Sequence, residues 1–100
     1  MKTGQVYILK CNDDSYYTGV SKNPEKRLAQ HNSGIPGSYT FYRRPVEMVW
    51  CSEEMKISTA IENEKRIKGW RRAKKEALIN GNFQKLHQLS KAYYKKDQKE

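Results

Sequence analysis

The sequence predicts a mixed α+β domain in which helices flank a small three-stranded antiparallel sheet. Two short runs rich in β-branched and aromatic residues, 6–9 and 16–20, are separated by the turn-forming residues 12–15, so they predict a β-hairpin. Apolar residues recur at helical spacing between residues 56 and 70. A chain of 100 residues makes one domain that buries roughly two-thirds of its unfolded surface, which allows a modest core without disulfides.

The elements between the hairpin and this helix follow from capping and turn residues. A first helix is predicted from Pro24 to about Asn32, because Asn23 is a favourable N-cap and proline fits the first helical position. Residues 33–38 contain two glycines and a proline and predict a flexible loop. Alternation of apolar and polar residues over 46–51 predicts the third strand.

Two further helices are predicted in the C-terminal part of the chain. The first covers residues 71–80, and its buried face is expected to consist of Ala73, Ala77 and Leu78. The second runs from residue 82 to about 96, with helical spacing of Phe83, Leu86, Leu89 or Ser90, and Tyr93. Gly81 is a typical helix end, so we predict a main domain over residues 1–81 and a basic amphipathic helix with a frayed tail over 82–100.

The charge of the chain favours a polyanionic partner such as nucleic acid. Twenty basic residues stand against 11 acidic ones, for a formal net charge of +9. The stretch 65–75 contains no acid and seven basic residues: Lys65, Arg66, Lys68, Arg71, Arg72, Lys74 and Lys75. Such a run on a helix is often only a solvated face, but the two tryptophans and seven tyrosines of the chain add weight to phosphate binding.

Cysteine usage and hydropathy exclude several other classes of protein. Cys11 and Cys51 are too few and too far apart for a zinc site or a disulfide scaffold, so both are predicted to be reduced core residues. The apolar run near the N-terminus, Val6 to Leu9, is too short for a signal peptide or a membrane span. We expect a cytoplasmic monomer with no membrane contact.

Glu64 interrupts the apolar stripe of the helix over residues 56–70. It falls three residues after Ile61 and three before Ile67, on the face that should be buried. An ionised carboxylate there loses hydration unless it gains a cation, which predicts an ion pair or a metal ligand at the floor of a cleft. The alternative is a surface glutamate paired with Lys68 at i,i+4, worth only about 0.2–0.5 kcal/mol.

Five residues, spread over the predicted hairpin and two predicted helices, form a recognisable pattern. Tyr7 and Tyr17 lie ten residues apart in the two hairpin strands, Arg27 and His31 stand at i,i+4 on the first helix, and Glu64 follows on a later helix. This order resembles the GIY-YIG nuclease family, and within it the small stand-alone bacterial branch, over roughly residues 5–80. The motif tripeptides depart from the family pattern at Val6, in place of glycine, and at Thr18, in place of isoleucine, and we expect the geometry to survive both changes.

The resemblance implies a GIY-YIG endonuclease-like fold and divalent-metal-dependent hydrolysis of phosphodiester bonds in DNA, in repair or recombination. Glu64 would hold one Mg²⁺ or Mn²⁺ ion, and Arg27 would bind the scissile phosphate through its two-pronged guanidinium. Tyr7 would be the general base, helped by Tyr17 or His31. A free tyrosine has a pKa of about 10, so nearby cations would have to lower the pKa of Tyr7.

Substrate contacts are expected from Gly19 and from part of the basic run, namely Lys65, Lys68, Arg71, Arg72, Lys74 and Lys75. Gly19 would allow close approach of the phosphate or simply form a bulge. Structural roles remain open for His31, as a last-turn residue of its helix, and for strand tyrosines such as Tyr16 and Tyr42, as core residues. Two other functions also remain open: a non-catalytic nucleic-acid-binding module, and a protein adaptor with an exposed apolar stripe along its last helix.

Overall fold

The computed structural model describes the backbone of residues 2–98 and the side chains of residues 2–90. The chain forms two compact units, Met1–Lys68 and Gly69–Glu100. The predicted boundary after Gly81 lies inside the second unit, because the two helices on either side of that glycine pack against each other. The extent of the nuclease domain stays a prediction. No helix in the described part of the chain is long and apolar enough to cross a membrane.

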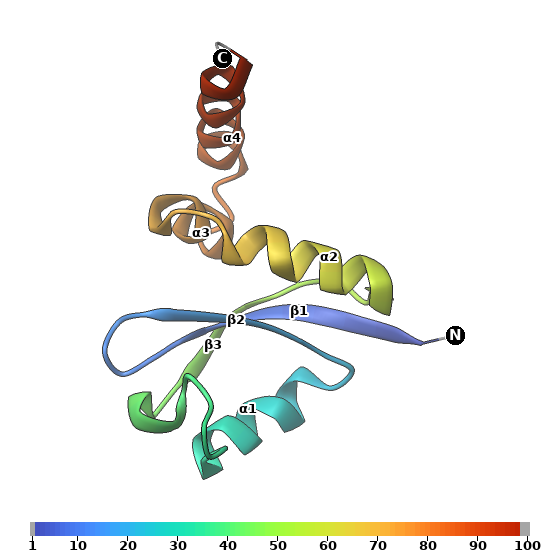
Figure 1. The fold of residues 1–100 in the computed structure, drawn as a ribbon, viewed down its shortest axis with the longest axis vertical. Coiled ribbons are helices and arrows are strands. Elements are labelled where there is room, and N and C mark those ends of the chain that lie inside the picture. Colours follow the sequence, from blue (N-terminus) through green and yellow to red (C-terminus); the bar gives the residue numbers. More distant parts are fainter. Residues whose placement is uncertain (1, 99–100) are drawn as a thin grey trace. The chain divides into compact units, whose positions relative to one another are not determined.

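The first unit consists of an antiparallel sheet with a helix on each face (Figure 1). Its elements in chain order are β1 (Thr3–Lys10), β2 (Tyr16–Ser21), α1 (Pro24–Ser33), the 3-10 helix η1 (Phe41–Arg43), β3 (Glu47–Cys51), β4 (Met55–Lys56) and α2 (Ile57–Lys68). The strand order is β2-β1-β3, which confirms the predicted three-stranded sheet. The additional strand β4 pairs with the start of β1 and is too short to show a sequence pattern.

Local chemistry explains where α1 begins and ends. The side chain of Asn23 accepts a hydrogen bond of 3.2 Å from the backbone N–H of Lys26, and Pro24 occupies the first helical turn. Gly34 ends the helix with a φ of 102°, a conformation that glycine adopts without a steric penalty.

The alternation of side chains along β1 gives the first unit two apolar layers. On the α1 side, Tyr7 and Leu9 form a buried cluster with Cys11 and Val46, against which Leu28 of α1 packs. The intervening residues of β1 are also buried, on the face that α2 covers (Figure 1).

Two predictions about buried residues in this unit were wrong. Cys11 is buried as expected, but Cys51 is exposed, because it is the last residue of β3. Ile61 is 39% exposed although Ala60 and Ile67 are buried. The buried face of α2 is therefore rotated away from Ile61, which places Glu64 at the border of the apolar stripe rather than in its middle.

The second unit contains α3 (Arg72–Ile79) and α4 (Phe83–Gln98), which pack against each other. Gly81 lies between them with a φ of 68°. Ala77 is buried as predicted and Leu78 is half-buried, but Ala73 is exposed because it lies in the first turn of this short helix.

The predicted apolar stripe of α4 is only partly buried. Phe83, at the start of the helix, is 67% exposed, whereas Leu86, Leu89 and Ser90 are half-buried. The side chain of Tyr93 lies outside the described residues.

Candidate active site

A chain of hydrogen-bonded side chains runs from the middle of the sheet into the loop after α1. The hydroxyl of Tyr7, a residue that is only 1% exposed, lies 3.2 Å from Nε2 of His31. Nδ1 of the same ring lies 2.7 Å from Oγ1 of the buried Thr40, and that hydroxyl lies 3.1 Å from Oγ of Ser38. The tyrosine, the histidine and the two hydroxyl residues therefore form a continuous relay, which we call the Tyr7 relay.

The direction of these hydrogen bonds follows from the burial of Tyr7. Within the described part of the chain, His31 is the one hydrogen-bond partner of the Tyr7 hydroxyl, so the tyrosine donates its proton toward Nε2. Nδ1 of the neutral ring then carries the hydrogen and donates it to Thr40, which donates in turn to Ser38. This tautomer leaves every group of the relay paired.

Burial holds both rings of the relay in their neutral forms. Desolvation raises the pKa of Tyr7 well above its ordinary value of 10.0, and the neighbouring Tyr17 and Glu64 raise it further while Arg27 lowers it. Desolvation, followed by the charge of Arg27, lowers the pKa of His31 below 6.5. Arg27 lowers the pKa of Tyr7 as expected of a nearby cation, but in the described chain desolvation outweighs its effect.

Tyr17 lines the relay on its other side. Its ring and that of His31 meet edge to face at a centroid distance of 5.1 Å, and it lies 6.3 Å from the ring of Tyr7. It is also stacked on Tyr39 at 6.1 Å, and the ammonium of Lys68 lies 5.9 Å from its centroid. Tyr17 thus connects the relay both to the loop after α1 and to the end of α2.

Gly19 has a steric role that the sequence did not reveal. It pairs directly with Tyr7 across the strands, and the register of β1 and β2 is regular there, which contradicts the alternative that Gly19 forms a bulge. A Cβ atom at Gly19 would lie 2.5 Å from Oη and 2.6 Å from Cζ of Tyr7. The absence of a side chain is therefore what lets the tyrosine ring lie across this strand. A contact of Gly19 with substrate stays a prediction.

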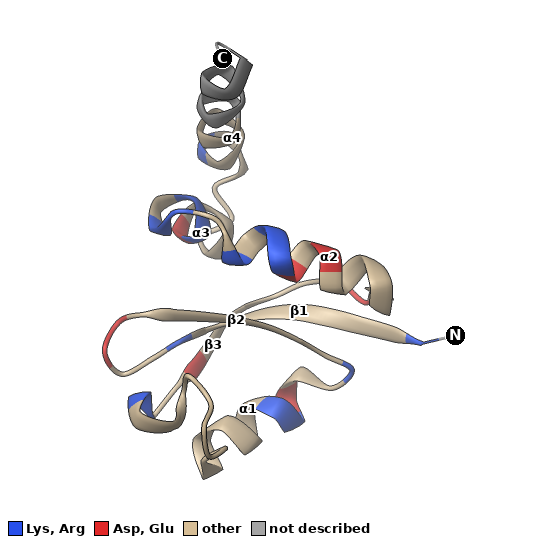
Figure 2. Cartoon of the chain, viewed as in Figure 1, with Lys and Arg blue, Asp and Glu red and all other residues tan. Residues whose placement is uncertain are grey.

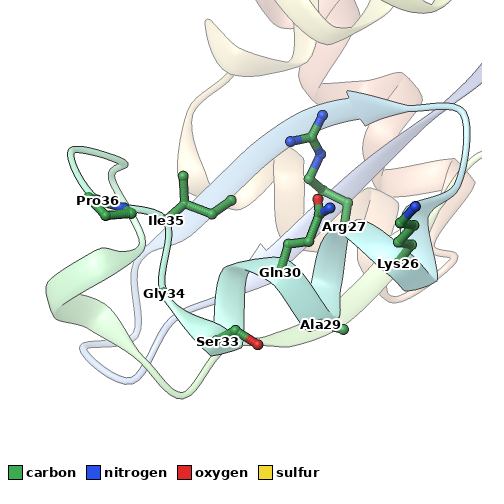
Figure 3. Close-up of a pocket in the computed structure, with 8 residues that line it drawn as sticks. All are labelled: Lys26, Arg27, Ala29, Gln30, Ser33, Gly34, Ile35 and Pro36. Atoms are coloured by element: carbon green, nitrogen blue, oxygen red, sulfur yellow. The ribbon is translucent and has the colours of Figure 1, made fainter.

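Arg27 supplies a positive charge next to the relay. It lies on the exposed face of α1 and lines an open hollow of about 550 Å³ between this helix and the residues that follow it (Figure 3). In the described chain no carboxylate lies within ion-pair distance of its guanidinium, although its charge acts on both Tyr7 and His31. An unneutralised arginine beside a buried hydroxyl is suited to binding an anion.

Glu64 combines the two interpretations that the sequence left open. Its side chain is 15% exposed, and Oε2 lies 3.1 Å from Nζ of Lys68, so the carboxylate is both largely buried and ion-paired at i,i+4. Its negative charge also raises the pKa of Tyr7. The structure thus brings Tyr7, Tyr17, Arg27, His31 and Glu64 into one neighbourhood.

The donor set at this site matches one kind of metal ion. The part of the chain that the structure describes has no group of three or more His, Cys, Asp or Glu side chains that could enclose a metal. A lone carboxylate fits a hard cation such as Mg²⁺, which keeps most of its waters and binds substrate phosphate, better than it fits a zinc or calcium cage.

The predicted basic residues are divided between the two units (Figure 2). Lys65 and Lys68 lie exposed on the second half of α2, in the unit that contains the relay. The other four belong to the second unit: Arg71 is exposed, Arg72 pairs with Glu76 at 3.2 Å, Lys74 lies 4.3 Å from the centroid of Trp70, and burial lowers the pKa of Lys75. Their contact with substrate stays a prediction.

The loop between α1 and β3 contributes residues that the sequence analysis missed. Thr40 and Ser38 extend the relay, and Arg43 places its guanidinium 3.9 Å from the centroid of Tyr39. The interpretation of Tyr42 as a core residue was wrong, because its side chain is 94% exposed. The cluster of hydroxyl, aromatic and arginine residues over 38–44 was the available signal, but it has no periodicity that predicts which side chains point inward.

Comparison with known proteins gives a consistent assignment. The family model described as the GIY-YIG catalytic domain matches residues 3–77. A UPF0213 protein from Syntrophus aciditrophicus is 42% identical over 87 residues, which cover 86% of this chain and 100% of that protein. Another from Natronomonas pharaonis is 43% identical over 74 residues, covering 74% and 87% of the two chains.

Two solved structures share the fold and belong to similar small proteins. The solution NMR structure of protein EF2693 from E. faecalis superimposes with a TM-score of 0.55 at 36% identity, covering 83% of this chain and 88% of that chain. The solution NMR structure of UPF0213 protein BH0048 from Bacillus halodurans gives a TM-score of 0.51 at 34% identity, covering 79% and 84%. The match over residues 3–77 includes every residue of the Tyr7 relay together with Arg27 and Glu64, and the chain therefore belongs to the GIY-YIG nuclease family.

Proposed function

We propose that this protein is a divalent-metal-dependent endonuclease that hydrolyses phosphodiester bonds in DNA, in repair or recombination. The observation that carries the proposal is the buried Tyr7 relay, with the charges of Arg27 and Glu64 acting on the same hydroxyl. Membership of a nuclease family makes nucleic acid the substrate class. The choice of DNA, the identity of the metal and the monomeric, cytoplasmic state are parts of the proposal.

Arg27 would bind the scissile phosphate. Its guanidinium has no competing carboxylate among the described residues, and its fork of donors matches two phosphate oxygens. Binding there would bring the phosphorus close to the Tyr7 hydroxyl, whose pKa the same guanidinium lowers.

Tyr7 would remove the proton from the attacking water without ionising beforehand. As the phenol oxygen accepts the proton from water, its own proton moves along the existing hydrogen bond to Nε2 of His31. The resulting imidazolium is oriented by Thr40 through Nδ1–H. This transfer suits a tyrosine whose pKa is raised by burial, since the free phenolate is never required.

Glu64 would hold the Mg²⁺ or Mn²⁺ ion, and Lys68 would orient and balance its carboxylate. When bound, such an ion supplies positive charge that stabilises the phosphate and the leaving oxygen in the transition state. A purely binding module would not require a largely buried acid beside a phosphate site, which argues against the first alternative function. For the adaptor alternative, the described part of α4 has an exposed Phe83 followed by a half-buried Leu86 rather than a continuous exposed stripe.

The test is a nuclease assay on labelled duplex, branched and single-stranded DNA, with Mg²⁺, Mn²⁺ or a chelator. Glu64→Gln removes the charge but keeps the shape, and we expect it to lower cleavage by about 100-fold or more, since a bound metal contributes several kcal/mol. Glu62→Gln, at an exposed position of the same helix, is the matched control and should cleave like the wild type.

Three outcomes would contradict the proposal or part of it. Full activity of Glu64→Gln would show that the Glu64 carboxylate does not hold the metal ion. Undiminished cleavage in chelator would exclude the metal requirement. A wild-type protein that cleaves no DNA substrate with either ion would refute the proposed endonuclease function.

A further inference from the structure

We infer that the segment Tyr39–Arg44 is a platform on which an unpaired base stacks, so that the active site receives a single strand of DNA. The residue that makes the contact is Tyr42. The inference rests on the proposed nuclease function, because it names the form of substrate that enters the same site.

Tyr42 presents its ring to solvent. Its side chain is 94% exposed, and no side chain or backbone group among the described residues forms a hydrogen bond with its hydroxyl. The ring of Phe41 contacts the ring of Tyr42 at a centroid distance of 4.9 Å and an interplanar angle of 89°. This contact supports the Tyr42 ring and leaves part of its aromatic surface free. A free aromatic face is the surface on which nucleobases stack, whatever their sequence.

The backbone under Tyr42 is held at several points, so its exposure is not that of a loose loop tip. The N–H of Phe41 donates to the carbonyl of Ser38 at 3.2 Å, and the N–H of Arg43 donates to that of Thr40 at 2.9 Å. The carbonyl of Arg43 accepts a bond of 2.9 Å from Asn12 in the hairpin turn. An aromatic residue whose backbone is already fixed loses less entropy when a base stacks on its ring than one on a mobile loop.

The arginine two residues after Tyr42 is also fixed in place. Arg44 donates through Nε to the carbonyl of Phe41 at 2.8 Å, and its guanidinium lies 4.8 Å from the centroid of that ring. The Phe41 ring, which supports Tyr42, and the Arg44 guanidinium next to that ring are therefore both positioned before a ligand binds.

The charges around the platform suit a nucleic-acid backbone. The stretch 26–46 contains no Asp or Glu and four basic residues, Lys26, Arg27, Arg43 and Arg44. Arg43 pairs with Asp13 at 3.0 Å, and the remaining three cations have no carboxylate partner within the described chain. A positively charged path with an exposed aromatic ring is the combination used for single-stranded nucleic acid.

The platform is continuous with the Tyr7 relay. Thr40, two residues before Tyr42, is bonded to His31, and Tyr39 is stacked on Tyr17. Two residues span at most about 7 Å of backbone, which is comparable to one or two nucleotides of a strand with a rise of about 3.4 Å each. A base stacked on Tyr42 would thus lie about one or two nucleotides from Thr40, the residue that bonds His31 in the relay.

Base stacking distinguishes this ligand from a duplex. In a double helix the faces of the bases are covered by their neighbours, whereas in a single strand they are available to an aromatic side chain. Tyr42 should therefore contribute to affinity for single strands and contribute little for duplex DNA.

The test measures binding in a chelator, so that no cleavage takes place. Fluorescence anisotropy with a labelled oligo(dT) strand and with a blunt duplex would compare the wild type with Tyr42→Ala, Tyr42→Phe and Phe83→Ala. We expect Tyr42→Ala to weaken single-strand binding by about 5- to 150-fold, which corresponds to one stacked base, and to leave duplex binding unchanged. Tyr42→Phe, which keeps the ring, and Phe83→Ala, an exposed aromatic of the second unit, should bind like the wild type.

A second readout reports the stack itself. A single strand that carries 2-aminopurine should be quenched when it stacks on the tyrosine, and Tyr42→Ala should abolish this quenching. Equal weakening on both substrates, unchanged single-strand affinity in Tyr42→Ala, or a wild type that does not bind the single strand would each overturn the inference. If the wild type cleaves DNA but Tyr42→Ala binds the single strand normally, only the stacking inference is contradicted. If single-strand binding depends on Tyr42 but the wild type cleaves no DNA in the presence of metal, only the nuclease function is contradicted.

Discussion

At the scale of single residues, the site depends on two groups that burial keeps uncharged. Tyr7 and His31 share a hydrogen bond of 3.2 Å, and each has its pKa displaced in the direction that disfavours its ion. Transfer of the proton between these two groups alone would create an ion pair that burial disfavours, so the proton should reach His31 only as the phenol oxygen accepts another from the attacking water. The relay is therefore suited to respond to a substrate rather than to the pH of the solution.

The neutral form of His31 predicts a pH dependence of stability. Its pKa in the folded protein lies below 6.5, so between these two values the unfolded chain binds a proton that the folded chain does not. Stability from this group is fully present above pH 6.5 and is lost as the pH falls below it. The slope approaches about 1.4 kcal/mol per pH unit for one proton.

Urea unfolding at a series of pH values from about 5 to 8, the range in which histidine titrates, would measure this slope. His31→Gln keeps a donor and an acceptor but cannot titrate, so the acid-side loss should become shallower even if the variant is less stable throughout. His87→Gln, at an exposed position of the second unit, should retain the wild-type slope. An unchanged slope in His31→Gln would show that other groups cause the acid loss.

At the scale of the elements, the pairing of β1 with β2 creates the space for the tyrosine. Register places Gly19 opposite Tyr7, so the glycine belongs to the geometry of the relay even though it carries no side chain. Gly4 makes a similar close approach, in this case to Cδ1 of Ile57, 2.6 Å from the position of a Cβ. The two glycines differ in which atoms would have to move to make room for a side chain.

Replacement of Gly19 should therefore be more damaging than replacement of Gly4. In Gly19→Ala the methyl group would meet a buried ring that is hydrogen-bonded to His31, and such overpacking costs about 1–3 kcal/mol. In Gly4→Ala it would meet the end of a flexible isoleucine, so the loss should be smaller. Denaturant unfolding of both variants provides the comparison, and a wild-type stability for Gly19→Ala would contradict the steric role.

The elements themselves could be predicted from sequence because local patterns determine them. Capping at Asn23, the turn chemistry of the hairpin and the apolar periodicity of α2 each act within a few residues. Periodicity identified the face of α2 but not its rotation against the sheet, so Ile61 was placed inside although it is exposed. The positions of Thr40 and Tyr42 depend on contacts with segments distant in sequence, such as the bond from Asn12 to Arg43, and no local pattern predicts them.

At the scale of the whole molecule, the net charge of +9 predicts salt-sensitive and largely sequence-independent binding. No described residue outside the first unit is needed for the Tyr7 relay, so the second unit can serve substrate affinity without altering the chemistry. We expect none of the described elements to read base edges in a major groove.

If about four cations contact the phosphates of a duplex, the logarithm of the affinity should fall with the logarithm of salt concentration with a slope near −3.6. For a single strand the same contacts give a slope of about −2.8. Affinities for two unrelated sequences, measured across a salt series in chelator, would test both points. A flat response would discredit the basic residues as the contact surface, and a large difference between the sequences would indicate a base-reading element.

The side chain of Asn32 has a consequence for how this protein can diversify. Its side-chain amide donates to the carbonyl of Val46 at 2.9 Å and accepts from the N–H of Val46 at 2.8 Å, in the same way as a hydrogen-bonded residue pair of an antiparallel sheet. The loop between them begins and ends at this single clamp, and each doubling of the length of a closed loop costs only about 0.6 kcal/mol. Insertions and exchanges at residues 35–37, which lie outside the relay, can therefore accumulate in evolution without disturbing the sheet, which makes this part of the loop a natural place for related proteins to acquire different substrate preferences around an unchanged catalytic core.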